Sequence, residues 1–222
     1  MSAYQIPLQI KLNDAATFAN FFEEGNEHAV ALVKGHDQFV YVWSVQATGK
    51  THLLQALCHQ SDNSIYLPIQ DYLLWEPAIF EGLESYDVIC LDNIEHIAGQ
   101  AIWEEALFNL YNRVRDANKR LIVSAKTSPR QAGFDLADLT SRLSWGVTIQ
   151  LNMLSDQQKV AALAMRANSR GFKLADEVVN YLLKFCPRDL HSLFQILEQL
   201  DDASLQAQRR ITIPFIKQHL SL

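Results

Sequence analysis

The chain has 222 residues, of which 49% are hydrophobic and 20% charged, and its formal net charge is −6 at pH 7. The length suits one domain or one domain with a small second one, and the composition is that of an ordinary globular protein. The acidic balance argues against a protein that mainly binds nucleic acid, because such domains are usually basic. Three scattered cysteines, no secretory signal and no long apolar run predict a cytoplasmic protein with free thiols and no membrane contact.

Residues 1–12 are predicted to form an extended tail, because Pro7 excludes a helix through this stretch. The apolar alternation around Leu8 and Ile10 fits an edge strand, which is the simpler interpretation from the residues alone. It also fits a linear peptide that docks in a groove of a partner protein, with Gln5, Leu8 and Ile10 as its anchors.

Residues 39–51 carry the strongest functional signal in the chain. Five apolar residues predict a strand buried on both faces, and a short loop ending in Gly49-Lys50-Thr51 leads into a helix. This is the context of a phosphate-binding P-loop: Gly49 allows a close backbone approach, Lys50 reaches the β- and γ-phosphates, and the Thr51 hydroxyl holds Mg²⁺. The predicted nucleotide-binding residues are Ser44, Val45, Gln46, Ala47, Thr48, Gly49, Lys50, Thr51 and His52.

Three further residues modify this interpretation. Ser44 stands where the usual pattern has glycine, and serine does not hold a strongly positive φ without cost. Asp92 closes the apolar run 87–91, where a carboxylate would lie beside the phosphates and order Mg²⁺; the alternative is a helix N-cap or turn residue. Asn93 follows where many P-loop proteins carry a second acid. An amide can orient water but cannot take its proton, which predicts weak intrinsic hydrolysis.

Strands and helices alternate along the first two thirds of the chain. This order predicts an α/β fold with a parallel sheet between two helical layers, over a domain spanning 13–152. From Ser155 onward the pattern is helical only, which predicts a small all-α lid domain at 153–222. The expected strands are 39–43, 64–68, 87–93, 119–125 and 146–151. Besides the helix that opens at 52–57 after the P-loop, the expected helices are 15–24, 26–34, 77–83, 101–117, 135–143, 155–171, 174–185, 188–208 and 214–220.

With this order of parts, the chain resembles the Hda family, bacterial regulators homologous to the replication initiator DnaA within the AAA+ P-loop proteins. The resemblance covers essentially the whole chain. Trp145-Gly146, shortly after Ser141-Arg142-Leu143, is a fairly specific mark of the DnaA clade. The segments that carry the resemblance are 92–99, 107–113, 141–146 and 205–215.

The resemblance implies roles for individual residues. Arg142 would be an arginine finger, supplied in trans to a partner's nucleotide, although a surface ion pair is the alternative. Arg188 would be the sensor 2 arginine, which contacts the nucleotide from the lid. The sensor 1 region would be Ser124-Ala125-Lys126. DnaA has an acid where Lys126 stands, so the sensor 1 chemistry is left open.

The resemblance also implies partners. The tail anchors Gln5, Leu8 and Ile10 are similar to the Gln-Leu-x-Leu-x-Leu peptides by which the family binds the DNA sliding clamp. The implied protein holds ADP, or ATP, with Mg²⁺, docks on the DNA-loaded clamp and promotes ATP hydrolysis by DnaA. Its contact with DNA would be mainly indirect, and AAA+ modules commonly self-associate, so a homo-oligomer is a further expectation.

Two other functions stay open at this stage. An autonomous ATPase of the DnaA or helicase-loader type would need only the P-loop and Asp92. An inactive scaffold would bind clamp and initiator, but Arg142 would not promote hydrolysis of the partner's ATP. DnaA continues past its lid into a basic helix-turn-helix domain, whereas this sequence ends at Leu222, so a complete initiator is not expected. The base of the nucleotide is not predicted.

Overall fold

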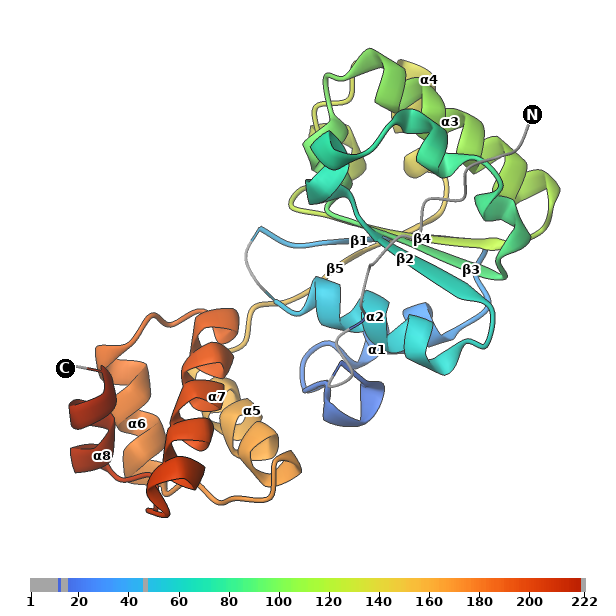
Figure 1. The fold of residues 1–222 in the computed structure, drawn as a ribbon. Coiled ribbons are helices and arrows are strands. Elements are labelled where there is room, and N and C mark those ends of the chain that lie inside the picture. Colours follow the sequence, from blue (N-terminus) through green and yellow to red (C-terminus); the bar gives the residue numbers. More distant parts are fainter. Residues whose placement is uncertain (1–11, 13–15, 46–47, 221–222) are drawn as a thin grey trace.

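The computed structural model describes residues 12, 16–45 and 48–220, which form an α/β domain followed by an all-helical region (Figure 1). The five strands form one sheet in the order β2-β3-β4-β1-β5, and every neighbouring pair is parallel. The predicted parallel sheet is therefore confirmed. The strands are β1 (Phe39–Trp43), β2 (Ser64–Pro68), β3 (Val88–Asp92), β4 (Arg120–Ala125) and β5 (Val147–Gln150).

Helices cover both faces of this sheet. α1 (Glu27–Lys34) and α2 (Lys50–Gln60) pack on one face, and α3 (Ala101–Asp116) and α4 (Ala137–Leu143) pack on the other (Figure 1). Alternation along each strand divides its residues between two cores. In β1, for example, Val40 and Val42 belong to the core on the α1–α2 side.

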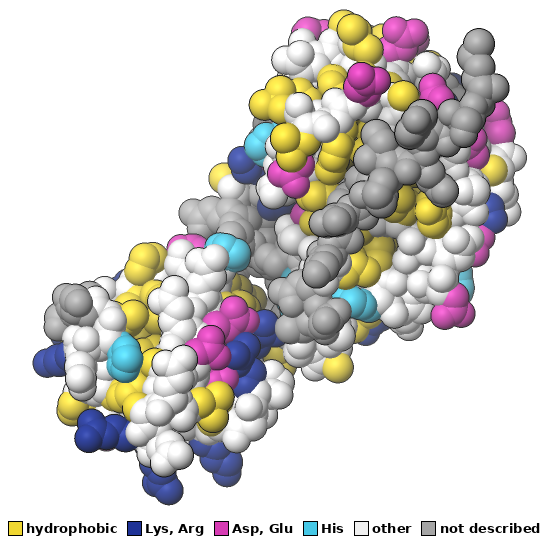
Figure 2. Space-filling view, viewed as in Figure 1, with side chains coloured by type: hydrophobic (Ala, Val, Ile, Leu, Met, Phe, Trp, Pro, Cys, Tyr) yellow, Lys and Arg dark blue, Asp and Glu magenta, His cyan; other side chains and the backbone are white. Residues whose placement is uncertain are grey.

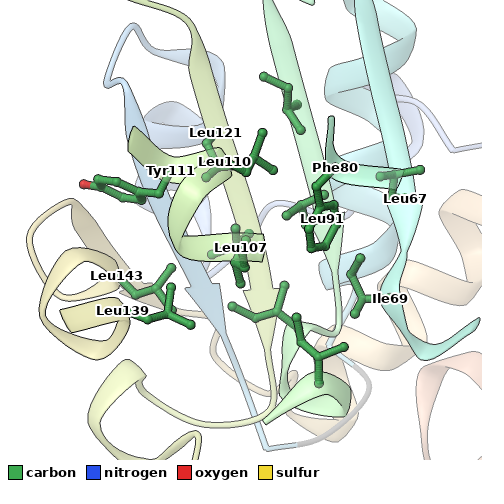
Figure 3. Close-up of a cluster of buried hydrophobic side chains, with 14 of the residues drawn as sticks. Leu67, Ile69, Phe80, Leu91, Leu107, Leu110, Tyr111, Leu121, Leu139 and Leu143 are labelled. Atoms are coloured by element: carbon green, nitrogen blue, oxygen red, sulfur yellow. The ribbon is translucent and has the colours of Figure 1, made fainter. Parts of the chain in front are cut away.

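The core on the other face is built by long apolar side chains from α3, α4 and the sheet. Figure 3 shows Leu107 of α3 between the sheet and the α4 residues Leu139 and Leu143, all of them buried. Gly146, between α4 and β5, is required by the same packing. A Cβ atom there would lie only 2.5 Å from the carbonyl oxygen of Phe39, closer than any real contact allows.

The C-terminal region has a hydrophobic core of its own, built from residues of all four of its helices. The Ser155 side chain accepts a hydrogen bond from the backbone of Gln158 and so caps the first of these helices, as its capping-box sequence predicts. The predicted fold class, an αβα P-loop domain followed by an all-α lid, is confirmed. No described helix is long and apolar enough to cross a membrane. The lid helices are α5 (Asp156–Ser169), α6 (Asp176–Phe185), α7 (Leu190–Ala207) and α8 (Ile213–Leu220).

Two predicted helices are wrong. Within the described part of 15–24 the structure has only a 3₁₀ turn, Phe18–Asn20, because Phe21 leaves helical geometry and packs its ring edge-on against His52, with 5.4 Å between centroids. The segment predicted as a helix at 77–83 consists of 3₁₀ turns at Pro77–Phe80 and Leu83–Ser85, which are separated by Gly82 at φ 75°. Tertiary packing and a left-handed glycine therefore override local propensity.

Candidate functional site

The carboxyl ends of β1, β3 and β4 open into a cavity of about 630 Å³, which lies between the α/β domain and the lid. This is where open parallel sheets bind their ligands, because loops from neighbouring strands diverge there. The α/β domain lines the cavity with Ala16, Val45, Thr48, Gly49, Lys50, Thr51, His52, Gln55, Asn93 and Lys126, and the lid lines it with Arg166, Leu190, His191, Phe194, Gln195 and Glu198.

Gly49 and Lys50 have the geometry of a P-loop that leads into a helix. Gly49 is left-handed at φ 97°, and a Cβ atom there would lie 2.9 Å from the Phe21 ring. Both facts require glycine. α2 begins at Lys50, so the N–H groups of its first turn and its positive dipole end face the cavity, as an anionic phosphate chain needs.

Ser44 holds the lysine of this loop in place. Lys50 Nζ donates to the carbonyl oxygen of Ser44 at 3.0 Å and to its Oγ at 2.9 Å, and the same Oγ lies 2.6 Å from Thr48 Oγ1. The conformational cost expected at Ser44 does not arise. The described non-glycine residues with positive φ are Asn93, Asn118 and Gln208, and Ser44 is not among them.

Asp92, the last residue of β3, is only 1% exposed and contacts Thr51, which lines the cavity. Its Oδ2 accepts hydrogen bonds from Thr51 Oγ1 at 2.6 Å and from the Tyr66 hydroxyl at 2.8 Å, and its Oδ1 accepts one from Ser124. Burial, and then the charge of Asp92, raise the pKa of Tyr66, so its hydroxyl remains a donor.

The pairing of Thr51 with Asp92 fits a magnesium site. Mg²⁺ prefers hard oxygen ligands and is usually held by one or two protein groups together with substrate phosphates. The Thr51 hydroxyl is hydrogen-bonded to the Asp92 carboxylate, and Lys50 is the neighbour of Thr51 in the chain. The residues expected to bind phosphate and to hold Mg²⁺ therefore lie together beside the cavity. When bound, the ion would neutralise phosphate charge there.

Asn93 has a backbone reason for being asparagine. Its φ and ψ are 61° and 50°, in the left-handed region that asparagine tolerates better than most residues. Its N–H donates to Ser124 Oγ at 3.0 Å, which fixes the turn after β3. Lys126, after β4, lines the same end of the cavity, and its Nζ lies 3.8 Å from Oε1 of the largely buried Glu95.

Burial dominates the electrostatics of the loop. It lowers the pKa of Lys50, an effect that Asp92 and Glu95 oppose and that Lys126 reinforces. Burial also lowers the pKa of His52, whose Nε2 lies 2.9 Å from the carbonyl oxygen of Thr17. Bringing an anion into the cavity would offset the effect of burial on Lys50, because it adds negative charge beside the ammonium group.

Two family models match the chain, and they match different parts of it. The model for the bacterial DnaA ATPase domain matches residues 77–150, and the model for the lid domain of Hda matches residues 156–220. The chain therefore has a DnaA-like ATPase domain followed by an Hda-type lid. The resemblance suggested by the sequence is thereby confirmed, and it places this nucleotide-binding domain in the context of DNA replication.

Solved structures show the same fold for this DnaA-like protein. Domain III of the Thermotoga maritima replication initiation protein DnaA is 18% identical, with a TM-score of 0.82 over 96% of this chain and 98% of that one. A DnaA bound to AMPPCP and single-stranded DNA is 21% identical, with a TM-score of 0.71 over 90% and 70% of the two chains. AMPPCP-bound DnaA from Aquifex aeolicus is 21% identical, with a TM-score of 0.65 over 79% and 62%.

The two arginines singled out in the sequence of this DnaA-like protein do not line its cavity. Arg142 lies near the end of α4, half-buried, with its guanidinium 5.5 Å from the ring centroid of Trp145, which is 74% exposed. The Arg188 side chain is 65% exposed, its Nε donates to the carbonyl oxygen of Leu183, and its Nη1 lies 3.6 Å from Asp156. The tail residues Gln5, Leu8 and Ile10 and the loop residues Gln46 and Ala47 lie outside the described residues.

Sequence reasoning missed most of the lid side of this site. Arg166 on α5 and five residues of the first half of α7 line the cavity, yet in the sequence they look like ordinary positions of amphipathic helices. Tyr66 was also missed, and Ser124 was expected only as part of the sensor 1 region, not as a partner of Asp92. Their signal was the position of Tyr66 within β2 and of Ser124 near the end of β4, beside the strand that carries Asp92.

Proposed function

We propose that this chain is a negative regulator of DNA replication initiation, which holds ADP, docks on the DNA-loaded sliding clamp and stimulates ATP hydrolysis by DnaA. The position of Arg142 carries the proposal. It does not line the chain's own cavity, and among the described residues no carboxylate lies within ion-pair distance of it. An exposed aromatic ring supports its guanidinium instead, which leaves the charge available to a second molecule.

The chain's own nucleotide would then have a structural or regulatory role. Lys50, Thr51 and Asp92 meet as nucleotide and Mg²⁺ ligands should, and DnaA structures bound to AMPPCP share the fold. Asn93 stands at the end of β3, where a base would be needed to activate water, and an amide cannot accept that proton. This combination favours a retained nucleotide such as ADP over rapid turnover.

The decisive experiment measures phosphate release from ATP-loaded DnaA with this protein, sliding clamp and DNA. We expect acceleration only with loaded clamp, and we expect Arg142→Ala to lower the stimulated rate by about 10³-fold, because a finger arginine acts on charge that develops in the transition state. Arg209→Ala, which removes an exposed arginine of the lid, is the matched control and should leave the rate unchanged. Hydrolysis by this chain alone, abolished by Lys50→Ala and indifferent to DnaA, would instead support the autonomous ATPase.

The clamp tether is a separate prediction, and it rests on the resemblance of the tail. A pull-down on immobilised clamp should recover the full chain, and a variant with Gln5→Ala and Leu8→Ala should lose most of that recovery, because both changes remove anchors of a short docking peptide. A variant with Lys11→Ala in the same tail keeps the anchors and serves as the control. Equal recovery of all three proteins would remove the tether from the proposal.

A further inference from the structure

The lid contributes one strongly basic side chain to the wall of the cavity. Arg166, in the last part of α5, is only 8% exposed and lines the cavity together with Lys50 and Thr51 of the P-loop. Burying a guanidinium is costly unless opposite charge lies close to it, so a buried arginine on a ligand cavity calls for an explanation.

Two residues of α7 hold Arg166 in this position. Its Nη2 donates to Glu198 Oε1 at 3.1 Å, and its guanidinium carbon lies 5.7 Å from the ring centroid of Phe194. Both partners line the same cavity. Figure 2 shows basic and acidic side chains gathered next to one another on the lid, on its side toward the α/β domain. The arginine is therefore fixed in direction as well as in place.

The charge of Arg166 reaches the P-loop helix. After burial, it is one of the causes that lower the pKa of His52, which stands in the first turn of α2. The cavity wall formed by described residues carries three side chains that are basic at pH 7, Lys50, Lys126 and Arg166, against one carboxylate, Glu198. This excess of positive charge fits an anionic ligand.

We propose that Arg166 is the lid residue that binds the phosphates of a nucleoside diphosphate, with Glu198 holding its guanidinium in the cavity. The inference rests on the proposed nucleotide, and it assigns the lid contact to a residue of α5. Arg188 is less suited to that contact here, because its side chain is mostly exposed and lies beside Asp156. A planar guanidinium can form two parallel hydrogen bonds to phosphate oxygens, which adds both affinity and orientation.

The test is the affinity of the full chain for ADP with Mg²⁺, measured by calorimetry. Arg166→Met should weaken binding by about 10- to 100-fold, which is the usual range for loss of a charged hydrogen-bond donor. Arg166→Lys keeps the positive charge but loses the paired N–H donors of the planar guanidinium, so its affinity for ADP should lie between those of the wild type and Arg166→Met. Arg188→Met should change affinity by less than about twofold.

Arg170→Met is the matched control for the ion-pair network. Arg170 also lies on α5 and donates to Glu198 at 3.3 Å and to Asp201 at 2.7 Å, but it does not line the cavity. Equal losses of ADP affinity for Arg170→Met and Arg166→Met would overturn the inference, since disruption of the ion pairs with Glu198 would then explain both losses. An affinity loss for Arg188→Met without one for Arg166→Met would also overturn it. If the wild type does not bind ADP, the proposed nucleotide itself fails; Lys50→Ala reports on that site independently. Thermal unfolding of each variant without nucleotide checks that it is folded.

Discussion

Replacing Glu104 by alanine is expected to destabilise the α/β domain by about 3 kcal/mol, because the substitution removes the side-chain acceptor of three backbone N–H groups at once. Glu104 lies on α3 and is fully buried. Its Oε1 accepts from the backbone of Gly99 at 2.6 Å and of Asp135 at 3.1 Å, and its Oε2 accepts from Leu136 at 2.7 Å. No other charged side chain among the described residues is 0% exposed.

Through these three hydrogen bonds, Glu104 connects the segment that follows β3 to the start of α4, the helix that carries Arg142. Gly99 belongs to the segment after Asp92 and Asn93, and Leu136 is the residue at which α4 is capped. Leu136 has no side-chain oxygen to cap the helix, and the Glu104 carboxylate, from a neighbouring helix, accepts instead from the backbone N–H of this N-cap residue and so fixes the entry into α4. Loss of Glu104 should therefore weaken the start of α4 more than the rest of the domain.

Urea denaturation of Glu104→Ala measures the predicted loss. Glu105→Ala is the matched control, since it removes the same side chain from the next, exposed position of α3 and should change stability by less than about 0.5 kcal/mol. Glu104→Gln keeps one acceptor oxygen and turns an amide toward backbone donors, so it should be intermediate. Identical midpoints for Glu104→Ala and Glu105→Ala would mean that water replaces the carboxylate at no cost.

The fold could be predicted from the sequence wherever local pattern and tertiary environment agree. The apolar run of β1 and the Gly-Lys-Thr turn into α2 specify strand, loop and helix within 22 residues, Phe39–Gln60, and the structure has them there. The order of the strands could not be predicted in this way. β4 lies between β1 and β3, which is a matter of long-range pairing that leaves no mark in the local pattern.

That strand order explains which site residues were foreseen. Lys50, Thr51 and Asp92 could be predicted from the sequence, because each belongs to a short motif whose residue types indicate its chemical role. Ser124 and Tyr66 hold Asp92 only because their strands lie on either side of β3, so their role depends on the sheet order. The lid residues that line the cavity were still harder to predict. The apolar periodicity of a helix shows which of its faces is buried, but not which helix of the lid will face the P-loop.

Replacing Lys50 by methionine is expected to abolish nucleotide binding, with a loss of at least about 100-fold in ADP affinity, and yet to leave the nucleotide-free protein as stable as the wild type or more stable. Burial lowers the pKa of Lys50. A lysine with a folded pKa below its unfolded value binds its proton less tightly in the folded state, so at pH 7 its charge opposes folding. A phosphate chain opposes that effect, because it adds negative charge beside the lysine.

The order of thermal stabilities of the two proteins should therefore change on adding ADP. Without ligand, Lys50→Met should unfold at the same temperature as the wild type or above it. At an ADP concentration of about 100 times Kd the wild type should gain about 2.7 kcal/mol, whereas the variant should gain almost nothing. Lys173→Met, at an exposed lid position, should follow the wild type in both conditions. A nucleotide-free Lys50→Met that unfolds well below the wild type would show that the lysine's hydrogen bonds to Ser44 outweigh the cost of burying its charge, and that the P-loop is stabilised by its own lysine before any phosphate arrives.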